Sequence, residues 1–435
     1  MVGNSICRYI LANKLLKETS WSFAAKGVAF VLFIALNIFL ARALGPEDFG
    51  RWSFFFSVLT VFFLLSYFGI NNSSQKFVAQ YNQTDKLRSV LVSSFWLRIV
   101  VSFLFSLLLL IVHKPLATLL GRPDLELLFL YAVPFIFLAG VIEYLKCIFE
   151  GLHRLKYNFI VNLLEYGLKL ALVILFLGFS GTLLSIVGAF TLALLITSLT
   201  GLYLLYTRFC RVFDESRSVS EKVDITGDIL KYSLPLFIIS IGFLIATEVD
   251  TIMLGLLSTD TEVGVYAVAK QIIVKVPHIS LAIAMGTMPV FAKLNESNRE
   301  GLRKLFNKLL KINTLVIVPI AMTILLFSGY LVPLIFGAGY SAAVFPLQIL
   351  VVYLLCTTFS TPLGSFLNYR GLATKRAINM SVMIFLNIIL NLLLIPQHGA
   401  IGAAIGTSAS FIPYLLLNWF EVRKVLLHDG DGAIG

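Results

Sequence analysis

Runs of about 20 apolar residues recur along the chain from Ser20 to Arg423, and this recurrence constrains the fold more than any other feature of the sequence. A helix of about 20 residues crosses a hydrocarbon core about 30 Å thick while satisfying its own backbone hydrogen bonds. We therefore predict an all-α polytopic membrane protein with twelve transmembrane helices. The predicted spans are 20–43, 50–70, 89–112, 125–148, 157–179, 182–206, 230–257, 264–290, 311–335, 343–366, 376–396 and 400–422.

The composition excludes a soluble globular protein. Of the 435 residues, 58% are hydrophobic and 13% are charged, whereas soluble domains have roughly 45–50% apolar and about 25% charged residues. Residues 1–20 lack the continuous apolar core and the cleavage site of a signal peptide, and they resemble a short basic amphipathic helix. The first span is therefore expected to be retained.

Basic residues account for the formal net charge of +11, and most of them line the short loops. Of the 34 lysines and arginines, 25 fall on one side of the predicted membrane and 4 on the other, and the excess marks the cytoplasmic side. Lys146 is counted among these loop residues. We predict a protein of the cell membrane with both termini in the cytoplasm, and we expect no nucleic-acid partner. The four cysteines lack metal-ligand spacing and are expected to be packing residues.

The second half of the chain repeats the first. The matching segments are 44–50 with 257–264, Gly151-Leu152 with Gly371-Leu372, and Gly181 and Gly188 with Gly399 and Gly406. Six spans in each half give both copies the same orientation, so the sequence predicts two six-helix bundles related by a pseudo-twofold axis along the membrane normal. The predicted parts are an N-terminal bundle at 1–206 that includes the amphipathic segment, a cytoplasmic linker at 207–229, a C-terminal bundle at 230–424 and a polar tail at 425–435.

Ionisable side chains lie inside several spans, where such groups are costly and usually functional. The basic ones are Lys26, Arg98, Lys169, Lys270 and Lys275, and the acidic ones are Glu165, Glu248 and Asp250. Five cations against three acids predict a mainly basic cleft with an acidic fringe. Such a cleft suits a phosphate or diphosphate, because Lys and Arg form charge-assisted hydrogen bonds with these anions.

Helical spacing places several polar groups on shared faces. These faces carry Ser94, Arg98, Ser102 and Ser106 in span three, Asn158, Asn162, Glu165 and Lys169 in span five, and Lys26 and Asn37 in span one. A polar face with a guanidinium at mid-span is not expected to face lipid. The predicted substrate-binding residues are Arg98, Lys169, Lys270 and Lys275, with Lys26 at the cytoplasmic mouth and Asn37 and Asn162 beside them.

Other interpretations of the same groups stay open. Glu165 and Lys169, one turn apart, suit an intrahelical salt bridge as well as a substrate role. Lys26 lies near enough to the cytoplasmic face for its ammonium to snorkel into water. The coupling-ion candidates, for H⁺ or Na⁺, are Asp250, Glu248 and Glu165. Glu248 and Asp250 are about 200° apart on one helix and are therefore not expected to face the same cavity.

Proline and glycine mark expected bends and close contacts. Pro277 is expected to kink span eight. Gly399, Gly402 and Gly406 are interpreted as sites of close helix packing. No Walker loop, dinucleotide fingerprint or zinc-ligand spacing appears in the sequence, so no cofactor other than a coupling ion is predicted.

Four segments taken in order carry a resemblance to a known family. They are Leu40–Gly50, Phe77–Tyr81, Glu248–Gly255 and Leu334–Ser341. They resemble the oligosaccharide flippases, or polysaccharide biosynthesis exporters, of the multidrug/oligosaccharidyl-lipid/polysaccharide exporter superfamily. The resemblance implies a V-shaped transporter with a MATE-like fold, which alternates access and flips a polyprenyl-(di)phosphate-linked oligosaccharide for polysaccharide or glycan biosynthesis.

The resemblance leaves two related activities open. A MATE-type drug/cation antiporter is expected to have an acidic, aromatic cavity, which five buried bases disfavour. A peptidoglycan lipid-precursor flippase usually has two further spans. We expect a transporter and not an enzyme, because no outer loop is long enough for the catalytic acids of a glycosyltransferase. The expected partners are the lipid-linked oligosaccharide, membrane lipids and glycan assembly enzymes, and the expected state is a monomer.

Overall fold

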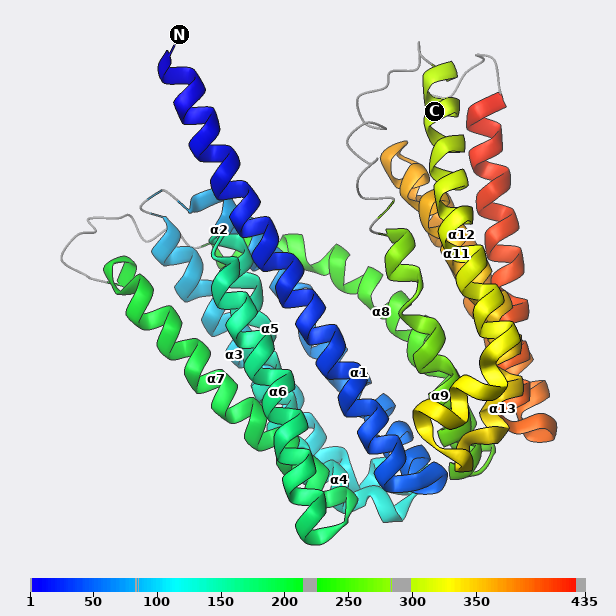
Figure 1. The fold of residues 1–435 in the computed structure, drawn as a ribbon. Helices are drawn as coiled ribbons and strands as arrows, with labels where there is room; N and C mark the ends of the chain where they lie inside the picture. The colour runs from blue at the N-terminus through cyan, green and yellow to red at the C-terminus, as the bar shows by residue number, and fades with distance from the viewer. Residues whose placement is uncertain are drawn as a thin grey trace. The chain divides into compact units, whose positions relative to one another are not determined.

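The structure of the chain is a computed structural model that describes residues 2–82, 84, 86–213, 225–281, 283 and 299–427. Regular structure in these residues is helical (Figure 1), as the apolar runs predict. The first-half helices are α1 (Val2–Tyr67), α2 (Ile70–Tyr81), α3 (Leu87–Leu119), η1 (Pro123–Leu125), α4 (Glu126–Tyr131), α5 (Val133–Gly151), α6 (Leu155–Ser180) and α7 (Leu183–Phe213). The second-half helices are α8 (Thr226–Leu257), α9 (Asp260–Val274), α11 (Arg299–Phe336), η4 (Ala338–Ala343), α12 (Val344–Tyr369) and α13 (Ala373–Leu427).

Seven helical stretches in the described residues are long and apolar enough to cross a membrane, and a bent pair, Pro123–Tyr131 with Val133–Gly151, forms an eighth. Two of the seven, Ser20–Tyr81 and Ala373–Leu426, have 62 and 54 residues, and each contains two predicted spans. α8 contains span seven, and α9 contains the first part of span eight. Each predicted span is therefore mainly helical in its described residues; residues 282 and 284–290 of span eight lie outside the described part.

Glycine and proline set the breaks between consecutive spans. Gly45 has φ 71° directly before Pro46, so α1 turns there and Pro46 begins its second limb. Gly399, with φ 52°, divides α13 into two limbs in the same way. The predicted bend near Pro277 is confirmed, because α9 ends at Val274 and a two-residue turn precedes the helical residues that begin at Pro277.

The two limbs of α13 pack closely at glycines. A Cβ atom on Gly402 would lie 2.3 Å from the carbonyl oxygen of Leu394, and one on Gly406 would lie 2.4 Å from Oδ1 of Asn391. Both distances are shorter than any side chain tolerates. The predicted close helix packing at these glycines is confirmed.

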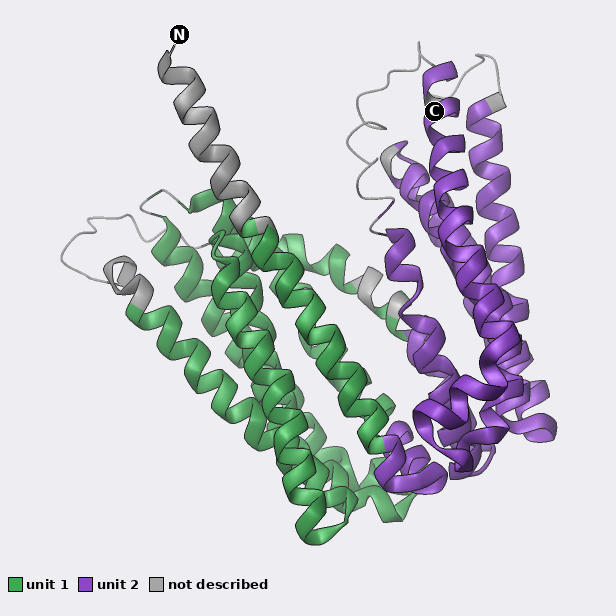
Figure 2. Cartoon of the chain, viewed as in Figure 1, with its two compact units in different colours: residues 1–40, 55–244 green, residues 41–54, 245–435 purple. Residues whose placement is uncertain are grey.

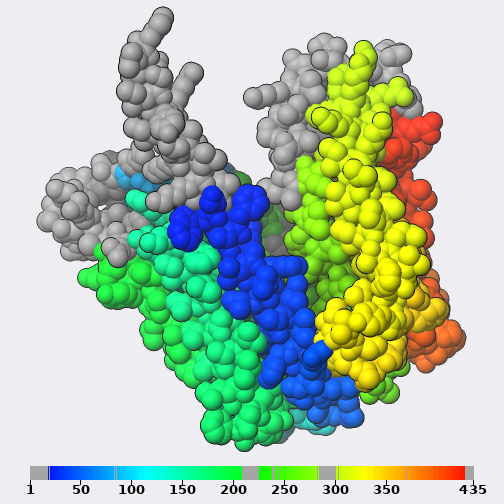
Figure 3. All heavy atoms as spheres, viewed as in Figure 1, coloured from blue at the N-terminus to red at the C-terminus, as the bar shows by residue number. Residues whose placement is uncertain are grey.

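The chain forms two compact units (Figure 2): unit 1 contains residues 1–40 and 55–244, and unit 2 contains residues 41–54 and 245–435. In unit 1, α1 lies along α6, as Figures 1 and 3 show. The ring centroids of Trp21 and Phe159 are 5.2 Å apart, and those of Phe33 and Tyr166 are 6.3 Å apart. Aromatic packing between these two helices therefore forms one face of unit 1.

The units do not divide at the predicted linker. Residues 226–244 of α8 belong to unit 1, where the Ser233 and Ser73 hydroxyls are 2.8 Å apart. Residues 41–54 belong to unit 2, where the hydroxyl of Tyr340 donates to the carbonyl of Ala41 at 2.8 Å. Each unit therefore contains a segment from the other half of the sequence.

Gly50 and Gly264, equivalent positions of the predicted repeat, lie where two helix starts cross in unit 2. A Cβ on Gly50 would lie 1.7 Å from the carbonyl oxygen of Asp260, and one on Gly264 would lie 2.0 Å from that of Pro46. The contacts are reciprocal, because each glycine faces the residue four positions before the other. This reciprocity supports the predicted equivalence of the two segments.

A second predicted match, Gly151 with Gly371, differs from the structure by two residues. The left-handed residue before α13 is Gly371, with φ 74°, whereas the one before α6 is His153, with φ 51°. In both turns the next amide bonds the carbonyl five residues earlier, at 2.8 and 2.9 Å. The structural offset is thus 218, the same as between Gly181 and Gly399. The sequence match failed because histidine takes a backbone conformation that usually indicates glycine.

Candidate functional site

Asp250 lies where three helices meet inside unit 2. Its carboxylate accepts hydrogen bonds from the hydroxyl of Tyr266 on α9 at 3.1 Å, from Nδ2 of Asn391 at 2.9 Å and from Oγ1 of Thr407 at 2.8 Å. The residue is 2% exposed. No lysine, arginine or histidine of the described residues forms an ion pair with it. These four residues, named here the carboxylate site, thus hold a buried acid with neutral donors only.

Further oxygen atoms surround the carboxylate site. Nδ2 of Asn391 also donates to Oδ1 of Asn387 at 3.2 Å, and the hydroxyls of Tyr266 and Thr407 are 3.2 Å apart. Oδ1 of Asn391 is buried and has no hydrogen-bond partner in the described part of the chain. It lies against Gly406, whose missing side chain leaves room for it. The site therefore combines a carboxylate with amide and hydroxyl oxygens, one of which is unused.

A cavity of about 80 Å³ borders the carboxylate site. Its lining residues are Ala246, Thr247, Glu248, Asp250, Tyr266, Lys270, Ile273, Val274, Leu350, Tyr353 and Thr407. The expectation that Glu248 and Asp250 do not share a cavity is therefore wrong. The cavity follows residues 246–250 of α8, whose side chains project over about 200° of the helix circumference, so it reaches both acids.

Lys270 belongs to this cavity, and Lys275 does not line it. Nζ of Lys270 donates to the carbonyl of Thr247 and to Oγ1 of Thr251, the second at 3.0 Å, so the ammonium is held on α8 beside the two acids. Lys275 is half-buried in the turn that follows α9. The structure thus brings one of these two predicted cations to the predicted coupling acids.

A second polar centre, named here the charge cluster, consists of Glu143, Lys146, Glu165 and Lys169 in unit 1. Glu165 bridges Nζ of Lys169 and Nζ of Lys146, both at 2.6 Å, and Lys146 also pairs with Glu143 at 2.6 Å. The predicted intrahelical pair of Glu165 and Lys169 is confirmed. With two positive and two negative groups the cluster is neutral, so Lys169 does not add positive charge to the mainly basic cleft that the sequence predicts.

Two members of the charge cluster were missed from the sequence. Lys146 was assigned to a cytoplasmic loop, but it lies in α5 and its side chain is 10% exposed. The predicted span 125–148 contains both Glu143 and Lys146, and their i and i+3 spacing indicates a pair that a membrane helix can bury. That spacing was the available signal.

The remaining predicted residues lie on or near the surface of unit 1. Nδ2 of Asn162 donates to the carbonyl of Asn158 at 2.9 Å, and Nδ2 of Asn158 donates to Glu150 at 2.8 Å. Asn37 is half-buried and donates to the carbonyl one turn before it. Lys26 is exposed. None of these residues lines the cavity beside Asp250.

Arg98 is 0% exposed, and its guanidinium satisfies the end of α1. It donates to the carbonyls of Ser66 and Gly140, at 2.5 and 3.0 Å, and it lies 5.3 Å from the ring centroid of Tyr67. α1 ends at Tyr67 because the next two residues have positive φ, which leaves the Ser66 carbonyl without its helical partner. The predicted polar face of span three is thus buried, and its arginine holds a helix end.

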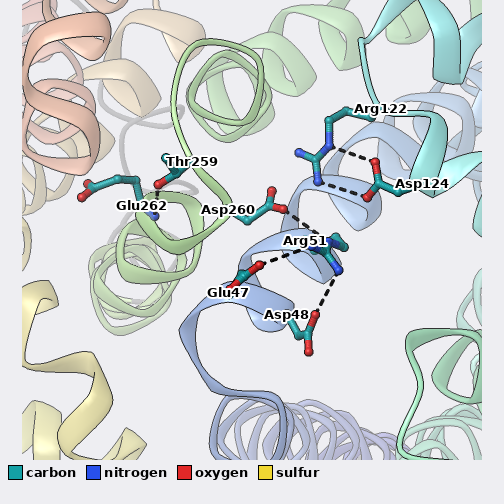
Figure 4. Close-up of polar contacts among 8 residues, drawn as sticks. All are labelled: Glu47, Asp48, Arg51, Arg122, Asp124, Thr259, Asp260 and Glu262. Atoms are coloured by element: carbon teal, nitrogen blue, oxygen red, sulfur yellow. Dashed lines mark hydrogen bonds and ion pairs between the residues drawn. The ribbon is translucent and has the colours of Figure 1, made fainter.

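Charged residues also fix the helix starts at the Gly45 turn of unit 2. Figure 4 shows Arg51 between Glu47, Asp48 and Asp260, at nitrogen–oxygen distances of 3.4, 3.3 and 3.3 Å. The carboxylate of Glu262 accepts from the first amide of the second limb of α13 at 2.7 Å. Acids at helix starts are favourable because the amide ends carry positive partial charge. These contacts anchor α9 to its neighbours.

Two family patterns match the chain. Residues 15–295 match the family described as "Polysaccharide biosynthesis protein". Residues 235–393 match the family described as "MatE". The first match covers well over half of the chain.

The chain is similar to several named proteins. "Uncharacterized membrane protein MJ1375" of Methanocaldococcus jannaschii is 26% identical, over 98% of this chain and 99% of that protein. "Lipopolysaccharide biosynthesis protein WzxC" of Escherichia coli is 24% identical, over 96% and 82%. "Probable low-salt glycan biosynthesis flippase Agl15" of Haloferax volcanii is 27% identical, over 42% of this chain and 38% of that protein.

Solved structures share the fold. A multidrug resistance MATE family transporter of the MOP superfamily, in an inward-facing conformation, matches with a TM-score of 0.71 and 18% identity, over 93% of this chain and 98% of that chain. The lipid II flippase MurJ, in an inward closed conformation, matches with a TM-score of 0.71 and 16% identity, over 94% and 89%. The predicted MATE-like fold is confirmed.

Proposed function

Because the chain belongs to the polysaccharide biosynthesis protein family, we propose that it is a flippase that alternates access and carries a polyprenyl-(di)phosphate-linked oligosaccharide across the cell membrane. Relatives named as a lipopolysaccharide biosynthesis protein and as a glycan biosynthesis flippase support this proposal. Ionisable groups buried among apolar helices support it as well, because such groups mark transport pathways.

We propose that Na⁺ binding at the carboxylate site drives the cycle. The observation that carries this proposal is Asp250, an acid that is 2% exposed and has no ion pair among the described residues. Burying a carboxylate that has no ion pair is costly, and a cation bound to it offsets that cost. Carboxylate, amide and hydroxyl oxygens favour a hard cation.

We expect the side-chain amide of Asn391 to change its orientation when a cation binds at the carboxylate site. Its Nδ2 now donates to Asp250 at 2.9 Å, while its Oδ1 has no partner among the residues that the structure describes. When a cation binds Asp250, the amide is expected to rotate and present Oδ1 to the cation, because a positively charged ligand repels an N–H donor. The rotation breaks the bond to Asn387 and so changes the packing inside α13 and against α8.

In each unit one predicted cation remains accessible to a phosphate head group. In unit 1, Lys26 is exposed, and in unit 2, Lys270 lines the cavity beside Asp250. Lys169 reaches a phosphate only when the charge cluster opens, since Glu165 now binds it at 2.6 Å. Arg98 contributes by holding the end of α1 and not by touching the substrate. Lys270 therefore connects the substrate to the cation site.

The proposal is tested with purified protein in liposomes that contain a fluorescent lipid-linked oligosaccharide. A Na⁺ gradient is expected to accelerate flipping by the native protein, and Na⁺ is expected to raise its melting temperature in detergent. Asp250→Asn should lose both effects. Glu248→Gln is the matched control, because it lines the same cavity without bonding the carboxylate site, and it should keep them. Flipping that is unaffected by a Na⁺ gradient, or that follows a proton gradient instead, would disprove Na⁺ coupling.

A drug/cation antiporter is the second candidate, because Glu248, Asp250, Tyr266 and Tyr353 make the cavity acidic and aromatic. A cavity of about 80 Å³ holds a hydrated metal ion, whereas drug-sized ligands need roughly 300–1,000 Å³, so we assign this cavity to the coupling ion and neither to a drug nor to the oligosaccharide. Cells that express the protein should therefore gain no efflux of ethidium. A peptidoglycan lipid precursor in the same liposome assay distinguishes the third candidate, a precursor flippase.

A further inference from the structure

Arg376, in the first turn of α13, extends its guanidinium into the helix bundle of unit 2. Its Nε donates to the hydroxyl of Tyr414 on the second limb at 3.3 Å. Three residues after Arg376, Nδ2 of Asn379 donates to Oδ1 of Asn418 at 3.0 Å. Tyr414 lies one turn deeper than Asn418, so Arg376 reaches past this amide pair. A surface arginine would instead extend outward to water.

The third helix at this place is α12, and it presents a glycine to the guanidinium. A Cβ on Gly364 would lie 2.7 Å from Nε of Arg376 and 2.8 Å from its Cζ. The side chain therefore lies directly on the backbone of α12. Only a residue without a side chain leaves this space, so the inward direction of Arg376 is built into the packing of three helix limbs.

Around Arg376, hydrogen-bond donors outnumber hydrogen-bond acceptors. A guanidinium has five N–H groups, and no carboxylate of the described residues forms an ion pair with Arg376, whose acceptor Tyr414 is neutral. Asn418 is 0% exposed, and its Nδ2 has no hydrogen-bond partner in the described part of the chain. A positive charge bonded to Tyr414, one helical turn from the buried, unused donor of Asn418, fits an anion with several acceptor oxygens.

Unit 1 has an anion at the equivalent helix start. α6 begins after the same left-handed turn as α13, and its first amide, on Leu155, donates to the carboxylate of Glu18 at 2.8 Å. The first turn of α13 contains Lys375 and Arg376 and no acid. Lys375 pairs with Glu421 at 2.8 Å, which leaves Arg376 uncompensated. At this helix start the first copy of the repeat therefore has the carboxylate of Glu18, whereas the second copy has the basic residues Lys375 and Arg376.

We propose that Arg376 and Asn418 bind the phosphate group of a membrane lipid. The planar guanidinium donates two parallel hydrogen bonds to phosphate oxygens, and Nδ2 of Asn418 donates a third. Basic pockets between membrane helices near the headgroup layer are suited to phosphate headgroups. The shared chemistry is a phosphate ester, supplied either by a polyprenyl phosphate or by an anionic phospholipid. The site is separate from the carboxylate site and does not depend on flippase activity.

Lipid binding is measured by native mass spectrometry of the full-length protein in detergent, with a polyprenyl phosphate, a phosphatidylglycerol and an uncharged diacylglycerol as probes. The native protein should retain one phosphate lipid and no diacylglycerol. Arg376→Gln should weaken retention about tenfold or more, because a charged hydrogen bond is lost. Asn418→Asp should abolish retention, since the new carboxylate pairs with Arg376. Arg376→Lys, which keeps the charge, should recover part of the affinity.

Arg423→Gln is the matched control, because Arg423 is exposed near the end of α13 and carries the same charge. It should bind like the native protein. Preferential retention of the polyprenyl phosphate would support the site and identify the carrier, and equal retention of both phosphate lipids would support a phospholipid site. Native-like binding by Arg376→Gln and Asn418→Asp, or an equal loss in Arg423→Gln, would overturn the proposal. The readout is binding alone, so its failure is distinct from a failure of flipping.

Discussion

Gly264→Ala is expected to push α9 away from the second limb of α1 where their starts cross in unit 2. The added Cβ would lie 2.0 Å from the carbonyl oxygen of Pro46 and 3.2 Å from the amide nitrogen of Gly50. Real Cβ atoms keep at least 3.0 Å from such neighbours. The two backbones therefore have to separate by roughly 1 Å at this point.

The energetic cost follows from the atoms in contact. Overpacking in a close-packed region costs about 1–3 kcal/mol, and the upper end applies here because no side-chain rotation can relieve a clash with a backbone carbonyl. Alanine has a helix propensity about 1 kcal/mol better than that of glycine, which offsets part of the cost. The expected net loss is about 2 kcal/mol. The ion pair of Arg51 and Asp260, at 3.3 Å beside the crossing, should lengthen as well.

Thermal unfolding of the purified protein in detergent measures this loss. Gly329→Ala is the matched control, because Gly329 lies in α11 with no atom within 4 Å of an added Cβ; it should be neutral or slightly stabilising. Gly50→Ala should destabilise like Gly264→Ala, and the double variant should cost less than the sum, since one separation relieves both clashes. Equal melting of Gly264→Ala and Gly329→Ala would refute the reasoning.

Further predictions concern the buried polar groups. Asp250→Asn should keep the fold and remove the melting shift that Na⁺ causes, because the neutral amide needs no counter-ion. Glu165→Gln should destabilise unit 1 by about 3–5 kcal/mol in an unfolding titration, since two ammonium groups lose their shared counter-charge; Glu165→Gln with Lys169→Met should recover part of this, and no recovery would argue against the pair. Arg98→Lys should lower the melting temperature, because an ammonium cannot bond the carbonyls of Ser66 and Gly140 as a guanidinium does; a native melting curve would contradict the capping role.

Most of the architecture could be predicted from apolar length and from breaking residues. The turns at Gly45-Pro46 and Gly399 and the bend near Pro277 follow from local backbone chemistry, which acts within a few residues. The break after Tyr67 comes three residues before the predicted end of the span at residue 70. Gly69, with φ 68°, is a sequence signal for this break, whereas Phe68, with φ 43°, is not. The break depends on Arg98, whose bond to the Ser66 carbonyl joins residues 32 positions apart.

The polar sites were predicted by residue type but not by partner. Helical spacing identified the Glu165–Lys169 pair, because both residues lie on one helix. It did not identify Lys146, which reaches Glu165 from another helix at 2.6 Å. Spacing on one helix therefore predicted an isolated pair, whereas the packing of α5 on α6 adds Lys146 and Glu143 and makes a neutral cluster of four. Which helices touch is a long-range property that periodicity within a single helix does not contain.

The same limit applied to Asp250. The sequence indicated a costly acid, but its donors Asn391 and Thr407 come from helix limbs more than 140 residues away. The angular argument separated Glu248 from Asp250 on an isolated helix. It failed because a cavity can extend around half of a helix surface, which depends on the size of the neighbouring side chains.

The exchange of segments between the units has a consequence for biosynthesis. Residues 41–54 belong to unit 2 and pack on the segment at Asp260 and Gly264. The ribosome synthesises that segment 214 residues later, since Pro46 contacts Gly264 and Gly50 contacts Asp260 across equivalent positions of the repeat. At about 5–20 residues per second, this interval is roughly 10–40 seconds. During it, the turn at Gly45 has to wait in the membrane without its partner. The folding of unit 1 is also completed late, since residues 226–244 are synthesised after all of its other helices. Two fragments cut between α7 and α8 would each lack a piece, so the halves mature together.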